Sequence, residues 1–373
     1  MPTTFDRHLF ARYLQVAAIL LVTLLGLVVV IDLLDNIDDF TMRAGDRGAA
    51  YLAFKIAEYY GTYSLLIFER VGGAVAMLAA MIVLWMLQRQ QELSVLLAAG
   101  VPAARLVLPV FAGVAVVGLL IGLDQEFVIP RIAALLQRQK GSDAPTEHRC
   151  DSTPDFSTGI TIFGKRLVLE TETVLQAEFV LPPDVAGTTT TLTAPAAQFL
   201  PEEGGRPAGW RLETPHPKPD ELTLTEYGRS LVKRVGGTDD LFVLSRVNCD
   251  QLFKSGSGFT KRSTVALLDR IESGTAAEND TRRMRAYVHR RLTNVPALLA
   301  ATGLVVPLML RKESRDAPLA FLRSAAAVGV AFGVLFGASL LADAAVLSAE
   351  SAAWLPIVAA ASAAAWFFRD IAT

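Results

Sequence analysis

The 373-residue sequence is poor in cysteine, histidine and charged residues. Two cysteines are too few for a disulfide-dense scaffold or for a zinc site with four cysteine ligands. The four histidines are scattered, without the spacing of metal ligands. Only 19% of the residues are charged, against about 25% in a soluble domain. The formal net charge of −2 gives no electrostatic basis for binding nucleic acid, so we expect no nucleic-acid partner.

Common motifs of nucleotide binding and catalysis are also missing. The sequence has no phosphate-binding G-x-x-x-x-G-K-[ST] loop, so we do not expect the chain to hold a nucleotide itself. It also has no H-E-x-x-H, G-x-S-x-G or C-x-x-C. We therefore expect no enzyme activity and no cofactor or metal. The energy for any transport must come from a partner or from a gradient.

Six long uncharged segments explain why 52% of the residues are hydrophobic. A transmembrane helix needs about 20 apolar residues to cross about 30 Å of hydrocarbon. Segments of about this length lie at residues 13–31, 71–87, 106–123, 292–310, 324–342 and 351–368. The second is the shortest, and we expect its helix to extend outward past Glu69 and Arg70. The sequence therefore predicts a polytopic α-helical membrane protein with six transmembrane helices.

A long polar segment separates the first three spans from the last three. Within it, alternating apolar residues between Pro- and Gly-rich turns predict short strands at residues 160–170, 174–181, 188–193, 210–213, 222–227 and 241–247. Many short strands are typical of a β-sandwich or jelly roll. The flanks, 129–140 and 263–291, are predicted to be helical connectors. The predicted organisation is helices 1–3 in residues 1–127, the β domain with its connectors in 128–290, and helices 4–6 in 291–373.

The basic residues favour cytoplasmic termini. With six spans both termini share one side, and the short segments there contain nine Lys or Arg residues, against four on the other side. An arginine cluster within residues 282–291, just before the fourth span, disagrees and makes the count equal. Long translocated domains are partly exempt from this rule, so we place the β domain outside the cytoplasm.

Both cysteines, Cys150 and Cys249, lie at the edges of the β domain. A disulfide between them would persist in an oxidising compartment. Two unpaired thiols are the alternative, and the sequence does not decide between a disulfide and free thiols.

A short amphipathic helix is predicted between the second and third spans, at about residues 88–103. Leu93, Leu96, Leu97 and Val101 share one helical face, and Gly-Val-Pro then ends the helix. Because both ends are tied to spans, such a helix suits docking of a partner and transmission of force. A plain interfacial helix on the bilayer is the alternative.

The segment ELSVLLAAGVPAARL resembles the E-L-x-x-x-x-A-x-G hallmark of the LptF/LptG family of lipopolysaccharide export permeases. Residues 267–308 resemble the family's helix after the β domain and the span that follows. Residues 32–40, DLLDNIDDF, resemble the exit of its first span. The arrangement of three spans, a β-jelly roll and three spans matches the whole chain.

This resemblance implies a permease subunit of an ABC exporter that extracts lipopolysaccharide, or a related lipid, from the bacterial inner membrane. The implied protein partners are a cytoplasmic ABC ATPase dimer, a second homologous permease and periplasmic jelly-roll bridge proteins. The β domain would then lie in the periplasm. The implied coupling helix comprises Glu92, Leu93, Leu96, Leu97, Ala99 and Gly100. Glu92 would be its coupling glutamate, and a solvated helix charge is the alternative for this residue.

The sequence departs from the family at the first span, where members often have a basic residue near the outer end and residues 28–32 have none. Arg70, beside Glu69, could contact lipid phosphate from the second span instead, since a guanidinium binds phosphate with two parallel hydrogen bonds. Arg290 and Arg291 are further candidates. Anchoring in the lipid headgroup zone is the alternative for all three arginines.

Three other functions are the alternatives to a transport permease. ABC-type mechanotransmission proteins usually have four spans, so six argue against that class. A membrane-anchored periplasmic scaffold or assembly protein without transport activity has no need for an amphipathic helix tied to two spans. A membrane enzyme conflicts with the missing motifs. Co-purification with an ATPase would separate the ABC-linked functions from the others.

Overall fold

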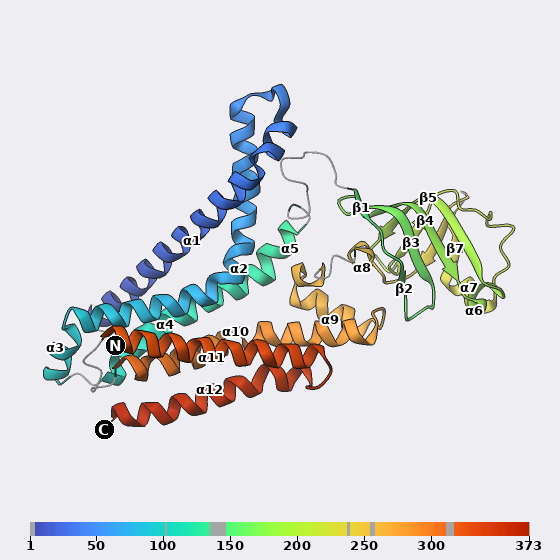
Figure 1. Ribbon diagram of the computed structural model, residues 1–373. Coiled ribbons are helices and arrows are strands. Elements are labelled where there is room, and N and C mark those ends of the chain that lie inside the picture. Colours follow the sequence, from blue (N-terminus) through green and yellow to red (C-terminus); the bar gives the residue numbers. More distant parts are fainter. Residues whose placement is uncertain are drawn as a thin grey trace. The chain divides into compact units, whose positions relative to one another are not determined.

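The computed structural model describes residues 4–100, 103–133, 135, 147–236, 239–253, 258–310 and 317–372. The chain divides into two compact units (Figure 1). The helical unit comprises Met1–Ile129 and Arg285–Thr373, and the β unit comprises Pro130–Met284. Each unit has a hydrophobic core of its own.

Long helices make up the helical unit, and among the described residues six of them are long and apolar enough to cross a membrane. This confirms the six predicted spans. These six are α1 (Thr4–Ala44), α2 (Ala49–Arg89), α4 (Ala103–Leu123), α10 (Glu278–Leu310), α11 (Ala317–Asp343) and α12 (Ala349–Ala372). Two short helices accompany them: α3 (Glu92–Ala98) lies between α2 and α4, and α5 (Ile129–Ile132) follows α4. A π-helical segment, Asp124–Val128, joins α4 to α5. As expected, α2 continues outward past Glu69 and Arg70.

Tyr13 of α1 shows how closely the helices pack. Its side chain is fully buried, and its hydroxyl donates a hydrogen bond to the backbone oxygen of Ala76 in α2, at 3.0 Å. A Cβ atom at Gly113 of α4 would lie 2.2 Å from the Tyr13 ring, so only glycine leaves room for the ring there. A small residue at a helix interface allows close approach, as in many membrane helices. The N-terminal part of α1 is therefore packed against both α2 and α4.

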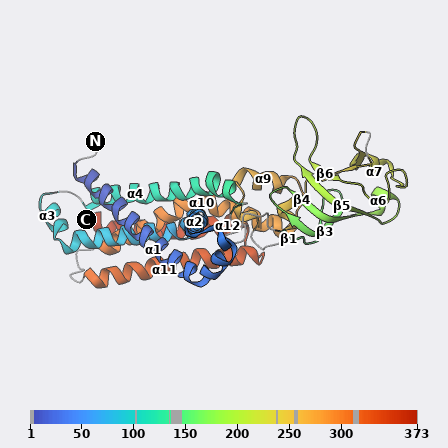
Figure 2. The same ribbon diagram turned by 90° about the horizontal axis from the view of Figure 1, so that it is seen from above.

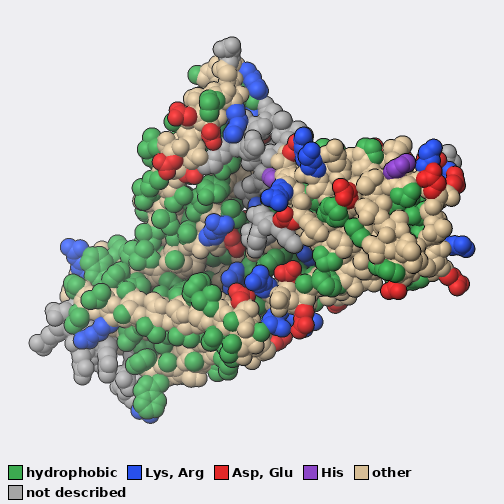
Figure 3. All heavy atoms as spheres, turned by 45° about the vertical axis from the view of Figure 1, so that its right-hand side comes forward, with side chains coloured by type: hydrophobic (Ala, Val, Ile, Leu, Met, Phe, Trp, Pro, Cys, Tyr) green, Lys and Arg blue, Asp and Glu red, His purple; other side chains and the backbone are tan. Residues whose placement is uncertain are grey.

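Thr302 connects α10 to the same core, with its hydroxyl 3.6 Å from the Met77 sulfur in α2. Seen from above, α4 and α10 run alongside α2 (Figure 2). Hydrophobic side chains dominate the visible surface of the helical unit (Figure 3). Val22, Leu34 and Phe336 are examples, each more than half exposed. Such an apolar exterior fits a hydrocarbon environment.

The β unit contains one antiparallel sheet of eight described strands. They are β1 (Glu147–Arg149), β2 (Thr153–Pro154), β3 (Thr161–Val168), β4 (Thr173–Leu181), β5 (Thr190–Leu200), β6 (Gly209–Leu212), β7 (Val232–Arg234) and β8 (Leu241–Leu244). Their order is β1-β3-β4-β5-β6-β8-β7, and β2 pairs with β3. Trp210 lies fully buried in the core, and its indole donates to the Val247 backbone oxygen at 2.8 Å. The predicted antiparallel β domain is confirmed, while the finer description as a sandwich or jelly roll does not follow from this single hydrogen-bonded sheet alone.

One strand prediction was wrong. Residues 222–225 form no strand, and helix α7 (Glu226–Leu231) begins directly after them. Thr225 caps this helix, because its hydroxyl oxygen accepts a hydrogen bond from the Gly228 N–H at 2.9 Å. The short strands β1, β2 and β7 were not predicted.

The described residues of both predicted connectors are mostly helical. In the segment 129–140, α5 covers the first four residues, and residues 136–140 lie outside the described part. The segment 263–291 is divided between α9 (Thr264–Glu272) and α10. Three further short helices of the β unit are α6 (Pro183–Ala186), α8 (Cys249–Leu252) and the 3-10 helix Gly258–Lys261.

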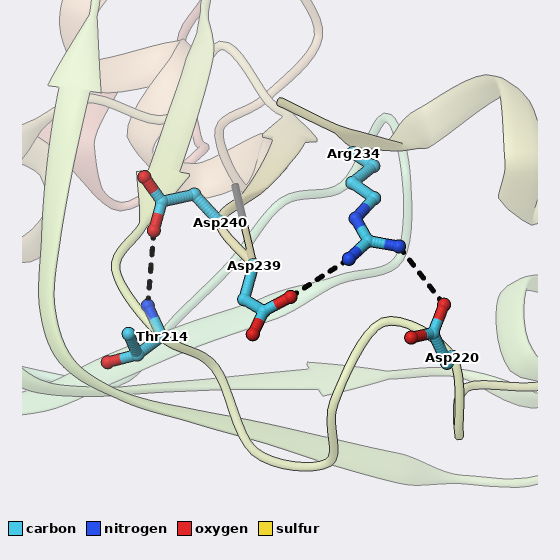
Figure 4. A network of polar contacts seen from close by, with 5 residues as sticks. All are labelled: Thr214, Asp220, Arg234, Asp239 and Asp240. Atoms are coloured by element: carbon cyan, nitrogen blue, oxygen red, sulfur yellow. Dashed lines mark hydrogen bonds and ion pairs between the residues drawn. The ribbon is translucent and has the colours of Figure 1, made fainter. Parts of the chain in front are cut away.

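Charged pairs hold the loops at one edge of the sheet (Figure 4). Arg234 bridges Asp220 at 3.0 Å and Asp239 at 2.8 Å. Asp240 accepts hydrogen bonds from Arg211 at 2.7 Å and from the Thr214 backbone N–H at 3.3 Å. These contacts tie the segment before β8 to β6 and to the end of β7. We assign this network a structural role.

Candidate functional site

Helix α3 begins after a sharp turn at the end of α2. The turn includes Gln91, which has a φ of 59°, in the left-handed region. The Gln91 N–H donates to the Gln88 backbone oxygen at 3.1 Å, and the Val95 N–H donates to the Gln91 backbone oxygen at 3.2 Å. Helix α3 ends before Gly100, whose φ of 76° favours glycine. A helix is therefore present within the predicted segment, and it covers Glu92–Ala98.

Glu92 is held by an arginine that lies 80 residues earlier in the chain. Arg12 Nη1 lies 3.2 Å from Glu92 Oε2 and 3.4 Å from Oε1. Arg12 Nη2 donates to Gln90 Oε1 at 2.6 Å. One guanidinium thus contacts residues on both sides of the turn. The Glu92 side chain remains 41% exposed, so this pairing leaves the carboxylate accessible to a partner.

The residues of α3 differ in where they face. Leu93 packs against the core of the helical unit, so it anchors the helix. Val95 is 67% exposed, and Ala99 and Gly100 are also exposed. The side chains of Leu96 and Leu97 lie outside the described residues. Val95 was not among the predicted site residues, because it lies off the stripe of leucines.

Two further contacts join the helices near α3. Arg105 at the start of α4 pairs with Asp6 of α1 at 3.8 Å. The Gln88 side-chain amide donates to the Met309 backbone oxygen of α10. In Figure 1, α3 and both chain termini lie at one end of the helical unit. This end therefore joins α1, α2, α4 and α10 around the short helix.

A second polar region lies where α2, the π-helical segment and α10 meet. Gln125 donates to Glu69 Oε1 at 2.9 Å. Arg291 lies 3.9 Å from Glu126 Oε2, and its guanidinium stacks on the Tyr287 ring at 4.6 Å. Asp124 is 5% exposed, and its two carboxylate oxygens have no hydrogen-bond partner among the described residues. π-Helical segments are frequent at functional sites, and intramembrane carboxylates are functional candidates.

The three candidate arginines differ in exposure. The Arg291 side chain is only 5% exposed and already contacts Glu126 and Tyr287. Arg290 is exposed and lies over the Tyr287 ring at 4.8 Å. Arg70 is exposed and makes no hydrogen bond or ion pair within the described part of the chain. Arg70 and Arg290 are therefore the two that present charge to the surroundings.

Cys150 and Cys249 are unpaired thiols in the structure, and both lie in the core of the β unit. Burial raises the pKa of the Cys150 thiol to about 11. Burial also raises the pKa of Cys249, and the negative charge of Glu172 adds to this effect. Both thiols are therefore held in the protonated form and are poor nucleophiles in the folded protein.

In a comparison with protein families, the chain matches the family model described as lipopolysaccharide export system permease LptF/LptG. The match covers residues 7–370 and thus includes α3 and the whole β unit. No curated protein matches the chain.

Proposed function

The chain belongs to the LptF/LptG family of lipopolysaccharide export permeases, and from this premise we propose that it works as the permease subunit of an ABC exporter. It extracts lipopolysaccharide, or a related lipid, from the bacterial inner membrane. A separate cytoplasmic ATPase dimer supplies the energy, and a second homologous permease completes the membrane part. The family is a transport family, and its members are not enzymes.

The position of α3 is the observation that supports this proposal best. The helix lies between two spans, begins with an accessible carboxylate at Glu92, and has an exposed apolar residue at Val95. A partner protein with a basic residue beside an apolar groove would fit this surface. Leu93 packs against the hydrophobic core of the helical unit, so a force on α3 is transmitted to the transmembrane helices.

Arg70 and Arg290 are the proposed contacts for lipid phosphates. Both are exposed, and a guanidinium can bind phosphate oxygens with two parallel hydrogen bonds. Arg291 has its own internal partners, so we give it a positioning role toward Tyr287 and Glu126. The β unit, as a periplasmic jelly-roll domain, then passes the lipid to bridge proteins of similar fold.

The test is recovery of an ATPase subunit with the purified permease in mild detergent. Glu92→Ala should weaken this association by about 2–5 kcal/mol if the contact is desolvated, which is a loss of tens- to thousands-fold. Glu58→Ala is a matched control, because Glu58 has the same 41% exposure and also pairs with a basic residue, Lys55. Membrane expression should be unchanged for both variants.

Two outcomes would contradict the proposal. Recovery of no ATPase with the wild-type chain would favour a periplasmic scaffold without transport activity. Full ATPase recovery and normal lipid export by Glu92→Ala would remove Glu92 from the coupling surface.

A further inference from the structure

The ion pair between Arg12 and Glu92 joins two parts of the helical unit that are far apart in sequence. Helix α3 is covalently continuous with α2 and α4, whereas α1 reaches it through space. Arg12 Nη1 contacts Glu92 at 3.2 Å, and Nη2 contacts Gln90 at 2.6 Å. The guanidinium therefore contacts both Gln90, in the turn that precedes α3, and Glu92, the first residue of α3.

Arg12 is held in place by its neighbours in α1. Leu9 is 1% exposed and Tyr13 is fully buried, so the helix is anchored on both sides of Arg12. The Tyr13 hydroxyl also bonds to the Ala76 backbone oxygen in α2. An arginine on a helix fixed in this way can transmit movement, because its backbone cannot shift independently of the span.

We propose that Arg12 is a positioning residue for the coupling helix. It orients the Glu92 carboxylate toward the ATPase and passes displacement of α3 directly to the first span. This inference rests on the proposed function. The ion pair is a third connection by which movement of α3 can reach the transmembrane helices, in addition to its covalent connections to α2 and α4.

The geometry favours positioning over competition with the partner. A carboxylate has about four lone-pair sites, and Arg12 approaches both oxygens through a single nitrogen. Since Glu92 stays 41% exposed, a basic residue of the ATPase can bind while Arg12 remains in place. The pair is also partly solvated, so its contribution to folding is small and an Arg12 variant should reach the membrane.

The experiment measures ATPase association and lipid export for the full-length permease co-expressed with the ATPase. Arg12→Gln should weaken association by about two- to five-fold, as expected for loss of a partly exposed ion pair. Arg12→Lys should restore part of the association, because an ammonium cannot contact Gln90 and Glu92 with a planar fork. Arg105→Ala, which removes the neighbouring contact with Asp6, is the control and should change association less.

The decisive variant combines Arg12→Gln with Glu92→Ala. If Arg12 acts through Glu92, the double variant associates no more weakly than Glu92→Ala alone. Full additivity, wild-type behaviour of Arg12→Gln, or tighter association of that variant would each overturn the inference. Loss of Arg12→Gln and Arg12→Lys from the membrane would also overturn it, since Arg12 would then be a folding residue. The wild-type result separates this inference from the proposed function. If no ATPase is recovered with the wild-type chain, the proposed function fails and this inference fails with it. If the wild type recovers the ATPase, the Arg12 results decide the inference alone.

Discussion

Cys150 and Cys249 lie in one core, although they are 99 positions apart in sequence. In the folded, reduced protein their raised pKa values keep both thiols protonated. At pH 8, the thiolate fraction of Cys150 is about a hundredfold below that of an ordinary cysteine with a pKa of 9.0. Labelling of the folded protein therefore reports burial and not pairing, and the redox state has to be read after denaturation.

We predict that the two cysteines form a disulfide when the β unit is in an oxidising compartment. The bond would close a loop of about 100 residues and stabilise the unit by about 4–5 kcal/mol in the chain-entropy model. The measurement is thiol labelling of denatured protein, with and without prior reduction. The expected result is no label before reduction and two labels after it. Two labels before reduction would show that the thiols are free.

At the residue scale, the sequence predicted one half of the ion pair and not the other. Glu92 stands out because it opens an amphipathic segment between two apolar spans. No local pattern singles out Arg12, since no periodicity relates residues that far apart. The pairing depends on how α1 packs against α2 and α4, and Tyr13 sets this packing through its contacts with Ala76 and Gly113. Local sequence patterns do not encode such a contact.

At the element scale, α7 shows why a strand prediction failed. The sequence from Leu222 to Tyr227 alternates apolar and polar residues, as a half-buried strand does. The Thr225 side chain, however, caps a helix and also donates to the Asp184 backbone oxygen at 2.6 Å. Capping and the packing of α7 on α6 override the alternation. The long spans and strands β3 and β4 were predicted well, because each has a strong pattern over many residues.

Gly228→Ala should destabilise the β unit. A Cβ atom at this position would lie 1.9 Å from the backbone oxygen of Val185, and neither backbone can move without breaking the cap at Thr225. We expect a loss of about 1–3 kcal/mol, as for other overpacked sites. The measurement is the temperature at which the β unit of the full-length protein becomes sensitive to protease. Gly236→Ala is the control, since nothing lies within 4 Å of its added Cβ. Equal midpoints for the two variants would contradict the packing argument.

At the scale of the whole molecule, six spans fix the sidedness of every connection. The termini and α3 follow an even number of crossings, so they share one side. The β unit follows the third crossing and the α11–α12 turn follows the fifth, so both lie on the opposite side. The count of basic residues favours cytoplasmic termini only if the arginine cluster before the fourth span is set aside. This cluster adjoins the long β segment, and long segments cross the membrane largely regardless of charge.

We therefore predict that the β unit is periplasmic and that α3 is cytoplasmic. Single cysteines at exposed positions test this: Tyr227→Cys in the β unit (49% exposed), Val346→Cys in the α11–α12 turn (68% exposed) and Val95→Cys in α3 (67% exposed). The native cysteines can stay, because they are buried and the parent protein measures their background. In intact spheroplasts, a membrane-impermeant maleimide should label positions 227 and 346, and position 95 only after permeabilisation. The reverse labelling pattern would show that the protein has the opposite orientation in the membrane, with α3 on the side away from a cytoplasmic ATPase. Labelling of all three positions from outside would contradict the six-span topology itself, because one crossing separates Val95 from Tyr227 and three separate it from Val346, which requires opposite sides.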